Sequence, residues 1–109
     1  MIKAVIVKRD GRTVNLRCEG HAYYDDPGRD IVCAAVSVLV INTINSIEKF
    51  CHYKVKMNSK EESGLIDCSF PEPLPEGGEL LIDSLCLGLS QIMNNYGDSY
   101  FKFKIQEES

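Results

Sequence analysis

Two strand-like runs lie near the start of the chain, with a short polar break between them, and apolar and polar residues alternate in the second run. The runs cover residues 2–8 and 13–19, and the break contains Asp10-Gly11. An Asp-Gly pair between two alternating runs is typical of a β-hairpin closed by a type I′ turn. In the second run, the residues expected to face the core are Val14, Leu16 and Cys18.

A loop over residues 20–29 interrupts this pattern, and a long apolar segment follows it. The segment predicts a helix from Ile31 to about Lys49, with Asp30 as its N-cap, because an aspartate there can accept a hydrogen bond from an unpaired amide. Its first turns are apolar on most sides, which requires burial on more than one side; a sheet on one side and a second copy of the chain on the other would satisfy this. The most apolar part, Ile31 to Ile41, is shorter than the roughly 20 residues that span a bilayer, so no membrane contact is expected.

The next segment predicts a second hairpin. Its first strand is half-exposed, with alternating apolar positions at Cys51, Tyr53, Val55 and Met57. Its partner strand covers residues 65–70. Residues 71–78 contain three prolines and two glycines, so we expect a surface connection there.

The end of the chain predicts a second helix and a last strand. Gly97 is expected to end the helix, and the strand covers residues 100–106. The helical stripe consists of Leu81, Leu85, Leu89, Ile92 and Tyr96. The predicted order, β-β-α-β-β-α-β, favours an α+β fold, a two-layer sandwich of a mainly antiparallel sheet with two helices. At 109 residues, the chain is expected to form one domain.

Charge and cysteine content narrow the class of protein. The net charge of −4 argues against a surface built to bind nucleic acid or anionic lipid directly, and a basic peptide suits it better. The five cysteines are odd in number and widely scattered, so we expect free thiols in a reducing compartment. No secretory signal pattern stands at the start, and a cytoplasmic location is expected.

Cys33 and His21 are the candidate catalytic pair. Cys33 falls in the first turn of the predicted helix, where unpaired amides and the helix dipole stabilise a thiolate and an oxyanion. His21 follows the second strand, so closing the loop would bring its imidazole to the thiol. Asp30 either caps the helix or orients His21, and capping is favoured.

Other interpretations of these residues stay open. A cysteine in an apolar helix is usually a small core residue, and the residue pattern alone favours that reading. Cys18 and His21 have C-x-x-H spacing, and Cys51-His52 could add ligands, but a second short-spaced pair is absent. We therefore expect no metal and no cofactor.

A resemblance to a known protein family favours the catalytic interpretation of Cys33 over the interpretation as a core residue. Gly20-His21-Ala22, Gly28 and the run Asp30-Ile31-Val32-Cys33-Ala34-Ala35-Val36-Ser37 resemble the signature of the ribosomal-processing cysteine protease family. The similarity extends to Leu85-Cys86-Leu87-Gly88-Leu89 and to the closing strand. Residues 51–70 resemble the family only in their general residue types.

The resemblance implies an activity and an assembly. The implied activity is an endopeptidase that removes a short N-terminal extension from the large-subunit ribosomal protein numbered twenty-seven. His21 and Cys33 fall on the catalytic positions of the motif, and the implied state is a homodimer. The substrate loop would contain Gly20, Ala22, Tyr23, Tyr24 and Gly28, acting either as a lid over the peptide or as simple packing. The alternative is a non-catalytic ribosome-assembly module that binds a basic ribosomal peptide without cutting it.

Overall fold

The computed structural model describes residues 1–20, 27–97 and 99–108, and of residues 27–30 only the backbone. Over these residues the order of elements is β-β-α-β-β-α-β, as expected. The elements are β1 (Ile2–Arg9), β2 (Arg12–Glu19), α1 (Pro27–Phe50), β3 (Lys56–Lys60), β4 (Leu65–Ser69), α2 (Glu76–Tyr96) and β5 (Phe101–Glu108).

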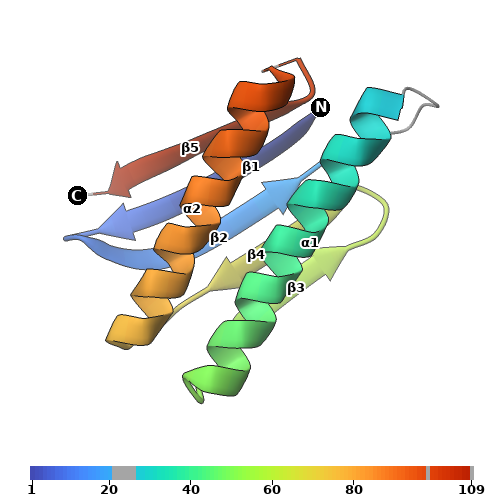
Figure 1. Cartoon of the computed structure of the whole chain (residues 1–109). Coiled ribbons are helices and arrows are strands. Elements are labelled where there is room, and N and C mark those ends of the chain that lie inside the picture. Colours follow the sequence, from blue (N-terminus) through green and yellow to red (C-terminus); the bar gives the residue numbers. More distant parts are fainter. Residues whose placement is uncertain (21–26, 98, 109) are drawn as a thin grey trace.

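The strands form one mixed sheet in the order β3-β4-β2-β1-β5. β1 and β5 are parallel, and every other neighbouring pair is antiparallel. Figure 1 shows α1 and α2 side by side on one face of this sheet. The α+β two-layer sandwich expected from the sequence is confirmed. In the described part of the chain, the opposite face of the sheet is not covered by a helix.

The first hairpin has the expected turn and an unexpected bulge. Asp10 and Gly11 both have positive φ, 53° and 77°, as a type I′ turn requires. Further along, Lys8 pairs with Thr13 and Val7 with Asn15, which leaves Val14 as an extra residue. Thr13 is therefore buried, and the prediction that Val14 faces the core was wrong. Leu16 and Cys18 are buried as predicted.

The buried Thr13 ties the hairpin to the second helix. Its backbone amide and its hydroxyl donate to the two carboxylate oxygens of Glu79, at 2.9 and 2.8 Å. Glu79 lies in the first turn of α2, so one side chain satisfies two partly buried donors and docks the helix onto the sheet.

Two other predicted boundaries were wrong. β3 begins at Lys56 instead of Cys51, and all of its residues are exposed because it is an edge strand. α2 begins at Glu76, inside the expected connection. It ends as predicted before Gly97, whose amide donates to the Met93 carbonyl at 2.9 Å. Its buried positions include Leu85 and Leu89, whereas Tyr96 is exposed.

α1 packs on the sheet along one face. The residues of that face are Val32, Val36, Val40, Ile44 and Ile47. The longer segment Ile31–Phe50, which includes the run Ile31 to Ile41, is long and apolar enough to cross a membrane by length and composition alone. Since its inner face is part of the hydrophobic core, the segment serves here as a core helix.

Candidate active site

Cys33 lies farther into α1 than the sequence suggested. The helix begins at Pro27, which suits the first helical position because its φ is preset and its missing amide would be unpaired there anyway. Cys33 is therefore in the second turn, about 9 Å along the axis from Pro27. The unpaired amides of the helix lie before it, and the prediction that they surround Cys33 was wrong.

The same boundary corrects two other predicted residues. Asp30 lies inside α1 and is not its N-cap, and Gly28 lies in the first turn instead of the loop. The sequence signal that could have found this start is Pro27, since proline is favoured at the first helical position. An orienting role for Asp30 stays a prediction, because its side chain is not described.

Gly20 fixes the backbone just before the candidate base. It has φ of 123°, and a Cβ atom there would lie 2.3 Å from the carbonyl oxygen of Met1. Its amide donates to the carbonyl of Ser63, in the turn between β3 and β4, at 3.1 Å. Only glycine fits this approach, which holds the end of β2 against both the first residue and the second hairpin.

Cys33 lines a cleft between α1 and the second hairpin. The cleft has a volume of about 380 Å³, and its wall includes Gly20, Ser37 and Ser59. A neighbouring cavity of about 240 Å³ shares Ser59 and Ile66 with it and continues along α1 to Asn45. Together the two cavities form a groove that starts at the thiol. Sequence reasoning missed this wall, because it comes from a hairpin distant in the chain.

His21, Ala22, Tyr23 and Tyr24 lie outside the described residues. The pairing of His21 with Cys33, and the choice between lid and packing for this loop, therefore stay predictions. The structure describes both flanks of the segment: Gly20, which lines the cleft, and the start of α1 at Pro27.

The remaining thiols differ from Cys33 in burial or position. Burial, with a smaller contribution from the negative charge of Cys33, raises the pKa of Cys18 to about 11. Burial, helped by Asp67 and Glu48, likewise raises the pKa of Cys68 to about 11. Cys51 is half-buried like Cys33 but follows the far end of α1.

Metal ligation finds no support in the described part of the chain. Among residues 1–20, 27–97 and 99–108, no three histidine, cysteine or acidic side chains gather closely enough to hold an ion. The suggested pairing of Cys18 with His21 involves a residue outside this part.

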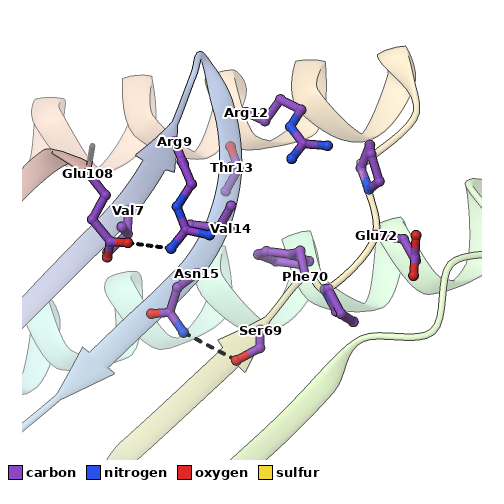
Figure 2. Close-up of a pocket in the computed structure, with 12 residues that line it drawn as sticks. Val7, Arg9, Arg12, Thr13, Val14, Asn15, Ser69, Phe70, Glu72 and Glu108 are labelled. Carbon is purple, nitrogen blue, oxygen red and sulfur yellow. Dashed lines mark hydrogen bonds and ion pairs between the residues drawn. The ribbon is translucent and has the colours of Figure 1, made fainter.

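Another cavity lies at the opposite end of the strands, beside the β1–β2 turn. Its volume is about 450 Å³, and Figure 2 shows Arg9 paired with Glu108 at its edge. Among the described residues, its lining contains hydroxyls (Thr13 and Ser69) but no cysteine or histidine. Although it is larger than the cleft at Cys33, it offers no thiol, so the cleft is the better candidate for the active site.

A partly exposed thiol at the head of a groove, on an α+β sandwich, defines a site for a cysteine-dependent hydrolase acting on an extended chain. The chain belongs to the cysteine protease Prp family, whose model matches residues 1–101. It is accordingly a cysteine-type peptidase of the ribosomal-processing family.

Individual relatives agree with this assignment. The ribosomal processing cysteine protease Prp of Bacillus subtilis is 30% identical over 104 residues, which cover 91% of this chain and 93% of the relative. A crystal structure of a Streptococcus mutans protein has a TM-score of 0.88 at 28% identity and covers 99% of this chain and 96% of the other. The crystal structure of the Staphylococcus aureus protease Prp in complex with a substrate peptide has the same fold, with a TM-score of 0.84 at 20% identity. The match covers 99% of this chain and 100% of the other chain.

Proposed function

We propose that this peptidase removes the N-terminal extension of a ribosomal protein precursor, the large-subunit protein numbered twenty-seven, in the cytoplasm. Cys33 is the nucleophile and His21 the base. The observation that carries the proposal is the half-buried thiol of Cys33 at the head of the groove, with Gly20, the residue before His21, in the same wall.

The groove suits an extended peptide. From Cys33 to Asn45 the helix advances about 18 Å, which is the length of about five extended residues. The part of the groove beyond the thiol is lined by Ile41, Ile44, Met57 and Ile66 together with two polar residues. Apolar or aromatic side chains of a substrate would be buried there, and the backbone of the peptide would lie along α1.

The proposed chemistry uses two residues. His21 takes the proton of the Cys33 thiol, and the thiolate attacks the scissile carbonyl to form a tetrahedral adduct. The adduct expels the amine, which takes the proton from His21, and leaves the extension bound to Cys33 as a thioester. Water then attacks the thioester and gives one proton to His21, which passes it to the departing sulfur of Cys33 and so restores the thiol. The extension leaves as a carboxylic acid, which loses its remaining proton to solvent.

The proposed assembly is a homodimer through the outer face of α1. Ile31, Val38 and Ile41 are 53%, 67% and 47% exposed, and Ala34 lies between them on the same side. Their spacing of three and four residues makes one apolar stripe, which a second copy of the helix would cover. Ile41 also lines the groove, so this interface would border the site.

Mass spectrometry of a precursor peptide tests the function. The native chain should split the peptide at one bond, Cys33→Ala should leave it intact, and Cys51→Ala should cut normally. Cys51 is the matched control because it is also a half-buried free thiol. An intact peptide with every variant, combined with saturable binding, would contradict the proposal and favour the non-catalytic assembly module.

A further inference from the structure

Three lysines form an exposed cluster on the face of the sheet that no helix covers. Ile2, Ala4 and Ile6 of β1 point into the core, so Lys3 between them points to the opposite face. Lys3 is in register with Lys102 of the parallel strand β5, and Lys104 pairs with Val5 two residues farther on. Lys3, Lys102 and Lys104 are all exposed, and we call them the lysine cluster.

The lysine cluster is electrostatically costly. Lys3 and Lys102 are direct cross-strand neighbours and carry the same charge. The distance between such neighbours is shorter than the Debye length, which is about 8 Å at physiological salt. Within the described residues, no carboxylate lies within ion-pair distance of any of the three ammonium groups. Glu19, which is in register with Lys3 on β2, pairs with Arg17 at 3.6 Å instead, so none of the three lysines has an ion-pair partner in that part of the chain, whose net charge over the full sequence is −4.

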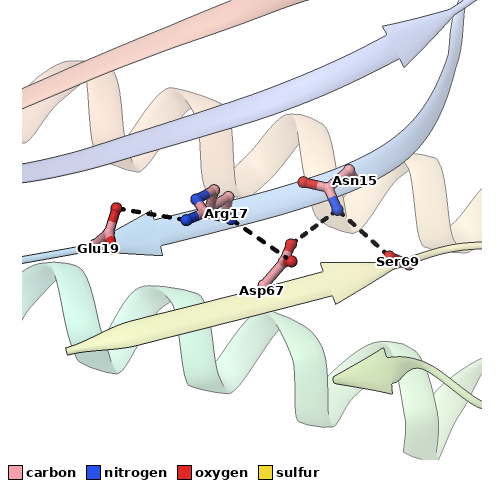
Figure 3. A network of polar contacts seen from close by, with 5 residues as sticks. All are labelled: Asn15, Arg17, Glu19, Asp67 and Ser69. Carbon is pink, nitrogen blue, oxygen red and sulfur yellow. Dashed lines mark hydrogen bonds and ion pairs between the residues drawn. The ribbon is translucent and has the colours of Figure 1, made fainter. Parts of the chain in front are cut away.

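Two arginines on the same face are paired with carboxylates. Figure 3 shows Arg17 between Glu19 and Asp67, with N–O distances of 3.6 and 3.8 Å, while Asn15 binds Asp67 and Ser69. Arg9, farther along β1, is paired with Glu108. Lys56 and Lys60 of the edge strand β3 also have no ion pair among the described residues, but they face Ser69 and Leu65 in the adjoining strand, so they do not gather as the lysine cluster does.

A shallow cavity of about 350 Å³ lies among the three lysines, with Val5, Met93 and Phe103 also in its wall. The outer edge of β5 is occupied at this point, because the amide of Phe103 donates to the sulfur of Met93 at 3.4 Å. A peptide strand that added to this edge would have to break that contact. The cavity is therefore better suited to a partner that is held by charge.

We propose that the lysine cluster binds the phosphate backbone of RNA. Lysine ammonium groups bind phosphate oxygens as point charges, without reading base sequence. The outward positions of β1 and β5 hold no aromatic side chain on which bases could stack, so phosphate contacts are the mode that this surface permits. The choice of RNA among polyanions rests on the proposed function, since the mature form of a ribosomal protein is itself a partner of ribosomal RNA.

The position of the lysine cluster agrees with such a role. Lys3 pairs with Glu19 at the end of β2, immediately before Gly20 and the groove. RNA would thus be held at the same end of the sheet as the active site but on the opposite face, which leaves the groove free for the peptide (Figure 1). The expectation that the protein avoids nucleic acid came from net charge, which does not report how charge is distributed.

Fluorescence anisotropy with a short labelled RNA duplex tests the proposal. The native chain should bind with an affinity that falls as salt rises, with a log–log slope of about 2 to 3. Lys102→Gln/Lys104→Gln should lower the affinity about tenfold and reduce the slope by about 1 to 2. The matched control is Lys49→Gln/Lys54→Gln, which removes the same charge from two other exposed lysines and should bind as the native chain does.

Peptide cleavage without RNA is measured in parallel and should be native for both double variants, which also shows that they fold. Equal loss of RNA affinity in the control pair, or no binding by the native chain, would overturn the proposal. Displacement of the duplex by poly-glutamate at an equal charge concentration would overturn it too, in favour of an acidic protein. RNA binding without cleavage of the peptide would instead refute the proposed function and leave the RNA site standing.

Discussion

The amide of Gly20 donates to the carbonyl of Ser63 at 3.1 Å, across a gap of more than forty residues in the chain. This hydrogen bond joins the end of β2 to the turn of the second hairpin, and both segments line the cleft at Cys33. The backbone of Gly20 makes this bond at a φ of 123° and against the Met1 carbonyl, a conformation and an approach that only glycine permits.

Replacing Gly20 with alanine should damage both stability and activity. A Cβ atom would lie 2.3 Å from the Met1 carbonyl, and the φ of 123° is unfavourable for alanine, so the backbone must move. We expect a loss of at least about 2 kcal/mol in the free energy of unfolding, measured with urea. Gly97→Ala is the control, since Gly97 also has positive φ but has open space around it. Equal losses in the two variants would show that the contact with Met1 is unimportant.

Blocking the groove should weaken substrate binding. Ser59 lines both cavities, so Ser59→Trp should raise KM for the precursor peptide about tenfold while kcat changes less. Asn58→Trp places the same bulk on the opposite face of the same strand and should leave KM within about twofold. If the tryptophan at position 58 has the larger effect, the peptide does not lie along α1.

A charge on the outer face of α1 should separate the proposed dimer. Val38 is 67% exposed and central in the apolar stripe, so Val38→Asp would bury an unpaired carboxylate in the interface. Sedimentation velocity should show a dimer for the native chain and a monomer for this variant. Leu80→Asp changes a residue of α2 that is 66% exposed and should remain dimeric. A native chain that sediments as a monomer would refute the proposed assembly.

Thiol alkylation should depend on pH in a site-specific way. Because the pKa values of Cys18 and Cys68 are raised to about 11, both are protonated at neutral pH, and their thiolate fraction grows about tenfold per pH unit until that value. Iodoacetamide at pH 8 should therefore modify Cys33 while Cys18 and Cys68 stay intact, as peptide mapping would show. Early labelling of Cys18 would mean that the core opens around it.

The sequence predicted the fold where local signals agree with packing. Alternation, the Asp10-Gly11 turn and the stop at Gly97 are confirmed, because each depends on the conformations that its own residues allow. Thr13 was misplaced because the bulge at Val14 arises from pairing with β1, which alternation within one strand does not reveal.

The candidate site was predictable only in part. Cys33 was found from the resemblance and from its place near a helix start. The start of α1 was placed after the capping signal of Asp30, which is too late, because the helix begins at Pro27. The groove wall at Ser59 and Ile66 could not be found from local patterns, because antiparallel pairing brings the hairpin there from another part of the chain.

The most direct measurement of the central claim is acid-quenched mass spectrometry of the enzyme during turnover of the precursor peptide. The account predicts a transient mass increase equal to the N-terminal extension less one water, mapped to Cys33 as a thioester and absent in Cys33→Ala. Cleavage that continues in Cys33→Ala, or an adduct mapped to any other residue, would contradict it.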